Sequence, residues 1–314
     1  MPKRLAGKSK PGRGKTRRPF GRIVIIGVGL IGGSIGLAVR KNRLADDVIG
    51  LGPNPRELKK AVSRGAIKRG VSAKRDYPHV LEGADLVILS GPVGTLVDTA
   101  ALIAPWITGK TVVTDVGSVK RAIVEPAAKH LSHEHYIGGH PIAGREFSGV
   151  EAAEAGLFSG AVCILTPTKE TSTRALRTVE RLWKGIGSRT VRMDPETHDW
   201  ILGLTSHLPH VVAYALISAV LEMQSARKGL TGYSAGGLRD FTRVAASSPE
   251  MWRDICMANR DALMAGLDAF EAVLARIRRH LKSGNAKALL SEFKKAGAGK
   301  KALASRGRSK RGRA

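Results

Sequence analysis

The fold is decided by one stretch near the N-terminus, Arg22-Ile-Val-Ile-Ile-Gly27-Val-Gly29-Leu-Ile-Gly32-Gly33-Ser34. Its Ile-Val-Ile-Ile run is β-branched and apolar at every position, as in a strand that helices cover on both faces. Gly27, Gly29 and Gly32 then form the G-x-G-x-x-G pattern, which allows a tight turn, close approach to a pyrophosphate and close packing of helix on strand. The sequence predicts a dinucleotide-binding unit with the phosphates at the start of a helix over 32–40.

The predicted cofactor contacts lie in this turn and at the end of a later strand. The strand over 84–90 ends in a Gly-Pro pair, and such an end faces the crevice where ligands bind to open parallel sheets. We therefore expect the dinucleotide to contact Gly27, Val28, Gly29, Leu30, Ile31, Gly32, Gly91 and Pro92.

The adenosine end of this predicted site departs from the usual pattern. The strand over 47–52 ends in Gly52, where an acidic residue usually binds the ribose hydroxyls. Without a carboxylate a 2′-phosphate is not repelled, and Arg56 could bind it; alternatively, Asn54 hydrogen-bonds the ribose of NAD. The sequence therefore leaves both NAD and NADP as cofactors.

Strands and helices alternate in the first part of the 314-residue chain, and only helices follow. We expect further strands over 110–115, 136–139, 161–165 and 189–192, and helices over 96–103 and 171–184. The predicted fold class is α/β, with a Rossmann-type dinucleotide-binding domain over 21–193 and an all-helical substrate and dimerisation domain over 194–290.

The last long helix predicts the oligomeric state. Its apolar residues recur at spacings of three and four, at Leu263, Leu267, Phe270, Leu274, Ile277 and Leu281. Such a stripe is typical of a core or a subunit interface. An elongated helical domain of this kind commonly pairs with its copy, so we expect a homodimer.

The positive charge of the chain is concentrated at its ends. The formal net charge is +26, and residues 1–20 carry eight Lys and Arg while residues 294–314 carry nine, with no acid in either. We expect disordered basic tails over 1–20 and 291–314 that keep the protein in solution. They could bind polyanions, but they do not interleave aromatic side chains for base stacking, so nucleic acid is not the expected partner.

Cysteine content and hydropathy indicate the compartment. Cys163 and Cys256 are too few for a disulfide framework and suit reduced core thiols. The longest apolar run, 211–221, is shorter than the roughly 18 residues of a membrane span. The basic N-terminus lacks the apolar segment of a secretory signal, although an organellar transit peptide stays open. We expect a cytoplasmic protein that does not enter a membrane.

Two polar residues follow predicted strands at the edge of the sheet where ligands bind. Ser118 either caps a helix or orients substrate and nicotinamide. His140 can take the proton of an alcohol as its hydride leaves. His133 and His135 precede the same strand and no other ligand cluster has suitable spacing, so no metal site is expected.

The helical part supplies further histidines and two arginines. Pro209 must bend the long helix around it, which leaves His207 and His210 either for a ligand or for capping and core hydrogen bonds. Arg239 and Arg243 are expected four apart on one helical face, and a guanidinium binds a carboxylate in a bidentate manner. Arg239 could pair with neighbouring acids, whereas Arg243 has more apolar surroundings and is the preferred ligand for an anionic substrate.

Together these motifs resemble the prephenate/arogenate dehydrogenase family of tyrosine biosynthesis. The resemblance spans roughly residues 21–285 and rests on Gly27-Val-Gly-Leu-Ile-Gly-Gly-Ser34, Asp115-Val-Gly-Ser-Val-Lys120, Gly139-His-Pro-Ile-Ala-Gly144, Ser206-His-Leu-Pro-His210 and Gly237-Leu-Arg-Asp-Phe-Thr-Arg243. It implies oxidation of the ring carbinol of prephenate or arogenate by hydride transfer to NAD or NADP. The ring carboxylate is lost as carbon dioxide, and the products are 4-hydroxyphenylpyruvate or tyrosine.

The resemblance also implies roles for single residues. His140 becomes the base on the ring hydroxyl, and Ser118 orients that hydroxyl, the histidine and the nicotinamide. Arg239 is the second choice, after Arg243, for the substrate carboxylate. The implied substrate contacts are His207, Arg243, Arg239 and Glu146.

Two other functions stay open at the level of sequence. A β-hydroxyacid dehydrogenase also joins a Rossmann domain to helices, but it relies on a catalytic lysine in a glycine-rich helix start. No such element begins the helical part of this chain. A polyanion-binding protein would instead use the nucleotide fold as a scaffold and bind through its basic tails.

Overall fold

The centre of the molecule is one sheet of eight strands. The computed structural model describes residues 18–145, 147–226 and 236–309. The strands are β1 (Phe20–Ile26), β2 (Ala45–Leu51), β3 (Arg69–Val71), β4 (Leu86–Leu89), β5 (Val112–Asp115), β6 (Tyr136–Ile142), β7 (Val162–Thr166) and β8 (Arg189–Arg192). Their order is β3-β2-β1-β4-β5-β6-β7-β8. All neighbours are parallel except β6 and β7, which pair antiparallel.

Helices cover both faces of this sheet, as strands that are apolar on both sides require. One face packs against α1 (Leu30–Lys41), α2 (Pro55–Ser63) and α6 (Thr173–Gly185). The other face packs against α3 (Tyr77–Leu81), α4 (Leu96–Ile103) and α5 (Arg121–His135). Short turns of helix complete the connections, at η1 (Lys74–Asp76), η2 (Val93–Thr95), η3 (Ala104–Trp106) and η4 (Val150–Ala152).

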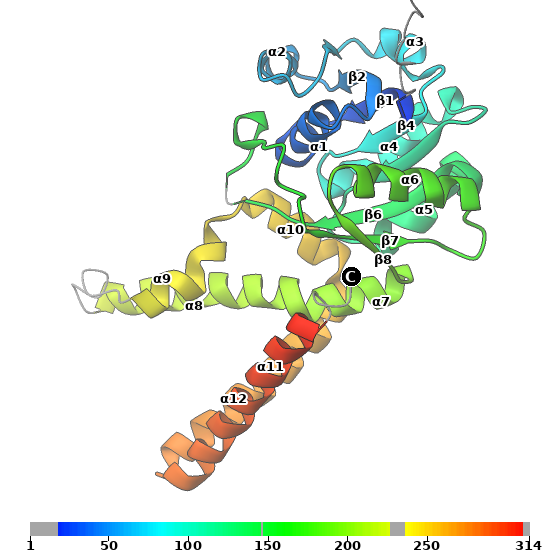
Figure 1. Cartoon of the computed structure of the whole chain (residues 1–314). Helices are drawn as coiled ribbons and strands as arrows, with labels where there is room; N and C mark the ends of the chain where they lie inside the picture. Colours follow the sequence, from blue (N-terminus) through cyan, green and yellow to red (C-terminus); the bar gives the residue numbers. More distant parts are fainter. Residues whose placement is uncertain (1–17, 146, 227–235, 310–314) are drawn as a thin grey trace, which may run out of the picture.

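The remaining elements are all helical. They are α7 (Pro195–Leu202), η5 (Gly203–His207), α8 (Leu208–Ala226), α9 (Gly236–Thr242), η7 (Arg243–Ala246), α10 (Pro249–Ala258), α11 (Arg260–Lys282) and α12 (Ala286–Ser309). Helix α10 returns to the sheet and buries Trp252 and Ile255 in the same core as α4 and α5. Helices α11 and α12 project away from the sheet as a pair (Figure 1). The predicted fold class is therefore confirmed.

Two features of the fold differ from the predictions. The short edge strand β3 was not expected, because three residues that are exposed or half-buried carry no apolar pattern. The segment from 291 to 309, predicted as part of a disordered tail, continues helix α12. It is rich in Ala and Lys, which favour helix, and Arg276 of α11 pairs with Glu292 of α12 at 3.1 Å. Residues 1–17 and 310–314 of the predicted tails lie outside the described residues.

Within the described segments, one helical run is long and apolar enough to cross a membrane, Pro195–Met223. Its mean hydropathy is 1.4. It contains the π-helical segment η5 just before Pro209, where the sequence predicts a bend. It also carries the buried polar side chains His198, Asp199 and His207. Only 11% of its apolar window is buried in this chain. Because polar groups at membrane depth are costly, the buried polar side chains argue against a membrane span.

Candidate active site

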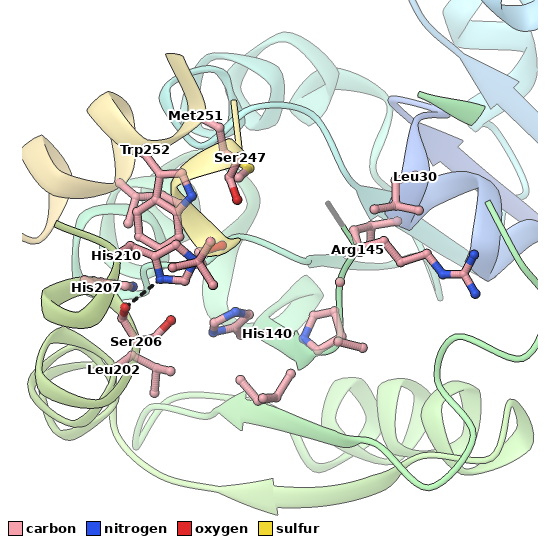
Figure 2. Close-up of a pocket in the computed structure, with 18 of the residues that line it drawn as sticks. Leu30, His140, Arg145, Leu202, Ser206, His207, His210, Ser247, Met251 and Trp252 are labelled. Carbon is pink, nitrogen blue, oxygen red and sulfur yellow. Dashed lines mark hydrogen bonds between the residues drawn. The ribbon is translucent and has the colours of Figure 1, made fainter. Parts of the chain in front are cut away.

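A cavity of about 530 Å³ lies between the carboxyl edge of the sheet and the helical part. The glycine turn contributes Leu30, the segment after β5 contributes Ser118, and β6 contributes His140. The helical part lines the opposite side from η5, η7 and α10, and Figure 2 shows His207, His210 and Trp252 across from His140. The cavity therefore joins groups from both parts of the chain.

The glycine turn has the shape that a dinucleotide needs. Gly27 has a φ of +93°, and a Cβ there would lie 2.8 Å from the backbone nitrogen of Gly91. A Cβ on Gly32 would lie 2.3 Å from the carbonyl oxygen of Gly27. A Cβ on Gly29, by contrast, would meet nothing within 4 Å. The first and third glycines thus close the turn, while the second leaves an open face for a pyrophosphate.

A second hollow, of about 260 Å³, adjoins this turn and contains the predicted adenosine end. There Asn54 caps α2, because its side-chain oxygen accepts from the backbone N–H of Arg56 at 3.0 Å. Ion pairs of Lys60 with Glu151 and Glu57 raise the pKa of Lys60 to about 12. No carboxylate stands at Gly52, and Arg56 is exposed beside the hollow. These residues can accommodate an adenosine ribose with or without a 2′-phosphate.

His140 stands where β6 leaves β5 and pairs with β7, opposite Ile164. Its Nδ1 lies 2.8 Å from Nε2 of His198, and its ring lines the cavity. Burial is the main cause that holds the pKa of His140 well below its usual value, and the neighbouring His198 and Lys120 add to the shift. The imidazole is therefore neutral at pH 7, which is the form that can accept a proton.

A buried ion pair links the end of β5 to β6. Lys120 and Asp115 have no exposed side-chain surface and are in direct contact. Lys120 also donates to the carbonyl oxygen of Gly139 at 2.8 Å, and the Tyr136 hydroxyl donates to Asp115 at 2.7 Å. Because Ser118 follows β5 and His140 follows Gly139, this network sets the position of both cavity residues.

His198 and Asp199 connect the helical part to this network. The Asp199 carboxylate accepts from the backbone N–H groups of Lys120 and Arg121 at 2.7 and 2.8 Å, at the start of α5. It also lies 2.7 Å from Nδ1 of His198, which is fully buried. Neither residue is predicted from the sequence. Their only sequence signal is a His-Asp pair in a helix whose following residues are apolar.

The two histidines around Pro209 differ in their surroundings. His207 is 1% exposed, its Nδ1 lies 3.0 Å from Nδ2 of Asn259, and burial lowers its pKa to about 4. His210 is half-buried and stacks on Trp252, with ring centroids 3.7 Å apart. Burial lowers the pKa of His210, and the positive charge of Arg243 adds to the shift. His210 therefore faces the cavity as part of a cationic and aromatic wall.

The structure brings together four of the six predicted catalytic and substrate-binding residues. Ser118, His140, His207 and Arg243 all line the cavity. Arg239 is exposed on α9 and does not line it. The expectation that both arginines share one helical face is wrong, because α9 ends at Thr242 and Arg243 begins the tighter turn η7. Glu146 lies outside the described residues.

The two histidines that precede β6 each contact a different partner. His133 pairs with Glu170 at 2.9 Å, and Nδ1 of His135 lies 2.8 Å from the carbonyl oxygen of Thr111. Across the described segments, no group of three or more His, Cys, Asp and Glu side chains is arranged to hold a metal ion.

Known protein families match both parts of the chain. Residues 35–192 match the family model "Prephenate dehydrogenase, nucleotide-binding domain". Residues 194–295 match "Prephenate dehydrogenase, dimerization domain". The two matches meet between β8 and α7, where the sheet ends and the helical part begins.

Individual relatives are similar over most of their length. The chain is 36% identical to a prephenate dehydrogenase of Bacillus subtilis over 87% of this chain and 74% of that protein. It is 38% identical to a cyclohexadienyl dehydrogenase of Zymomonas mobilis over 88% of this chain and 93% of that protein. A solved structure of Aquifex aeolicus prephenate dehydrogenase, in complex with hydroxyphenyl propionate and NAD+, has a TM-score of 0.85 and 34% identity, and the match covers 93% of this chain and 100% of that one.

Proposed function

The chain belongs to the prephenate dehydrogenase family, and from this we propose that it oxidises prephenate or arogenate in tyrosine biosynthesis, with NAD or NADP as hydride acceptor. One observation carries the proposal. His140 and Ser118 from the nucleotide-binding part and Arg243 from the helical part line the same cavity, next to Leu30 of the glycine turn. A β-hydroxyacid dehydrogenase is no longer a competing assignment, because both family models match.

His140 and Ser118 are suited to act on the substrate hydroxyl. His140 is neutral at pH 7 because burial lowers its pKa, so it takes the hydroxyl proton, while the Ser118 hydroxyl holds the same oxygen. The bound cofactor supplies the hydride acceptor. The ring then loses its carboxylate as carbon dioxide and becomes aromatic. The proton on His140 returns to the phenolic oxygen, so the base is regenerated without net release of a proton.

The far wall of the cavity is suited to the substrate side chain. Arg243 supplies a guanidinium, and its charge is close enough to lower the pKa of His210. A guanidinium matches a carboxylate in a bidentate manner, and both prephenate and arogenate carry a carboxylate on their side chain. The phenol-and-carboxylate ligand named for the Aquifex aeolicus protein has the same two ends.

The exposed apolar residues of the helical part support a homodimer. Several large apolar side chains are exposed on α8, α11 and α12, at Leu221, Met223, Met264, Leu274, Leu281, Leu290, Phe293 and Leu303. Exposed apolar surface on an elongated helical part is available to an interface. The matching family model is a dimerisation domain, so we assign this surface to a second copy of the chain.

The cysteines support a cytoplasmic location. Cys163 and Cys256 are both free, and burial raises the pKa of each thiol. A reducing compartment keeps such thiols unpaired, as expected of an enzyme of amino-acid biosynthesis.

The direct test measures both substrates against both cofactors. The purified protein is supplied with prephenate or arogenate and with NAD or NADP, and the absorbance of the reduced nicotinamide is followed. Turnover in at least one combination, with carbon dioxide released in equal amount, is the expected result. Absence of turnover in all four combinations by a protein that binds the cofactor would overturn the proposal.

A further inference from the structure

We propose that His198 and Asp199 are positioning residues that hold His140 in the tautomer with a free lone pair on Nε2. The inference rests on the proposed function, in which His140 is the base. It concerns two residues to which neither the sequence motifs nor the cavity assigns a role.

The direction of each hydrogen bond follows from the chemistry of its partners. Asp199 offers only oxygen atoms, and it already accepts from two backbone N–H groups, so Nδ1 of His198 must donate to it. A neutral His198 then has its lone pair on Nε2, which lies 2.8 Å from Nδ1 of His140. Nδ1 of His140 must therefore donate, and its own lone pair is left on Nε2.

The cavity lies on the free side of this chain of bonds. His140 lines the cavity, and its Nε2 makes no hydrogen bond with any residue in the described segments. His198 has no exposed surface, so it reaches neither solvent nor the cavity, and Asp199 is only 4% exposed. The two residues therefore act on the substrate only through His140.

The consequence for proton transfer is direct. If Nε2 of His140 carried the hydrogen, it could not take the proton of the substrate hydroxyl, and that fraction of the enzyme would be inactive. Once His140 is protonated, its Nδ1–H donates to a histidine that a carboxylate orients, which stabilises the imidazolium. The same logic applies where an aspartate holds the histidine of a hydrolase triad.

The anchoring of Asp199 makes the arrangement rigid. Its two backbone donors belong to α5, and its own carbonyl oxygen accepts from Nδ2 of Asn259 at 2.7 Å. Substitution of Asp199 would remove these bonds along with the one to His198. Variants of His198 are therefore the sharper test.

Two substitutions of nearly equal size separate the roles of His198. In His198→Gln the amide oxygen reaches the place of Nε2 and can accept from His140, so the tautomer is kept. In His198→Asn the shorter side chain can still donate to Asp199 but does not reach His140. We expect kcat within about 10-fold of the parent for His198→Gln and about 10²-fold lower for His198→Asn, with KM and cofactor affinity little changed in both. Equal kcat values for two folded variants would overturn the proposal.

A measurement that does not depend on turnover completes the test. In protein labelled with 15N at histidine, the His140 signals are assigned from their loss in His140→Asn. We expect Nε2 without hydrogen and Nδ1 with hydrogen at neutral pH in the parent, and a mixture of tautomers in His198→Asn. Hydrogen on Nε2 in the parent would overturn the positioning role. Failure of the proposed function would appear separately, as absence of turnover in the parent with both substrates.

Discussion

Lys120 and Asp115 form an ion pair in which neither side chain has any exposed surface. The pair links the end of β5 to Gly139 in the middle of β6, next to His140 in the chain. Its remaining polar atoms are satisfied by Tyr136, Gly117 and Gly139. A buried pair of this kind is costly to break, because one charge is then left without its partner.

Lys120→Met is expected to lower the free energy of unfolding by about 3–5 kcal/mol, since it leaves Asp115 charged and unpaired in the core. Urea denaturation followed by circular dichroism measures the change. Lys184→Met is the matched control, because Lys184 is exposed and Glu180 keeps its pair with Arg192, so the loss should be no more than about 1 kcal/mol. Similar losses for both variants would contradict the structural role of the buried pair.

Gly29→Ala and Gly32→Ala are expected to fail in different ways. A Cβ at position 29 meets nothing in the protein, so Gly29→Ala should keep its thermal stability and bind NAD or NADP more weakly. A Cβ at position 32 would collide with the Gly27 carbonyl, so Gly32→Ala should unfold at a lower temperature. Thermal unfolding and cofactor titration by fluorescence distinguish the two. Unchanged cofactor affinity in Gly29→Ala would exclude that face as the phosphate site.

His140→Asn is expected to lower kcat by about 10²–10⁴-fold while the cofactor still binds, because the glycine turn is untouched. His130→Asn is the control, since His130 is exposed on α5 away from the cavity. Initial rates and cofactor titration are measured for both. Near-normal turnover in His140→Asn would remove His140 from the role of base.

The pH dependence of kcat/KM should reflect the low pKa of His140. The base works in its neutral form, so activity is lost as pH falls through the pKa in the folded protein. Because burial holds that pKa well below 6.5, kcat/KM should stay level from pH 8 down to pH 6.5 and fall only at more acid pH. Half-maximal activity near pH 6.5 would show that the pKa of His140 is not lowered.

Arg243→Ala is expected to raise KM roughly 10-fold to 100-fold with a smaller effect on kcat, since the lost contact is to the substrate side chain. Arg239→Ala is the comparison, because Arg239 lies outside the cavity and should leave KM nearly unchanged. Steady-state kinetics with the preferred substrate measure both. A larger rise in KM for Arg239→Ala than for Arg243→Ala would assign the carboxylate contact to Arg239 instead.

The sequence predicts those parts of the site that are determined by residues close to one another in the chain. The G-x-G-x-x-G turn is encoded within six residues, and its glycines are needed for contacts that the turn itself creates. The position of Ser118 after β5 follows from the alternation of strand and helix, whereas β6 continues past its predicted end at Gly139 to Ile142, so that His140 lies within the strand. His198 is different, because its partner His140 lies 58 residues away in sequence and only the packing of α7 on α5 brings them together.

The extent of α12 could not be predicted for a related reason. Its apolar residues are too few to show a clear stripe, so the segment resembles a solvated tail in composition. Its stabilising contacts come from α11, as in the pair between Arg276 and Glu292. A helix that is stabilised mainly by packing on a neighbouring helix is difficult to predict from its own sequence.

Asp199 lies in the helical part, yet its carboxylate caps the start of helix α5 in the nucleotide-binding part by accepting from the backbone N–H groups of Lys120 and Arg121. A molecule whose two halves have come apart would keep the glycine turn and still hold a dinucleotide. It would lack the contact that orients the imidazole, and it would stay idle. The reaction therefore requires the two parts to be docked correctly. A copy in which they are not docked would bind the cofactor but would not reduce it.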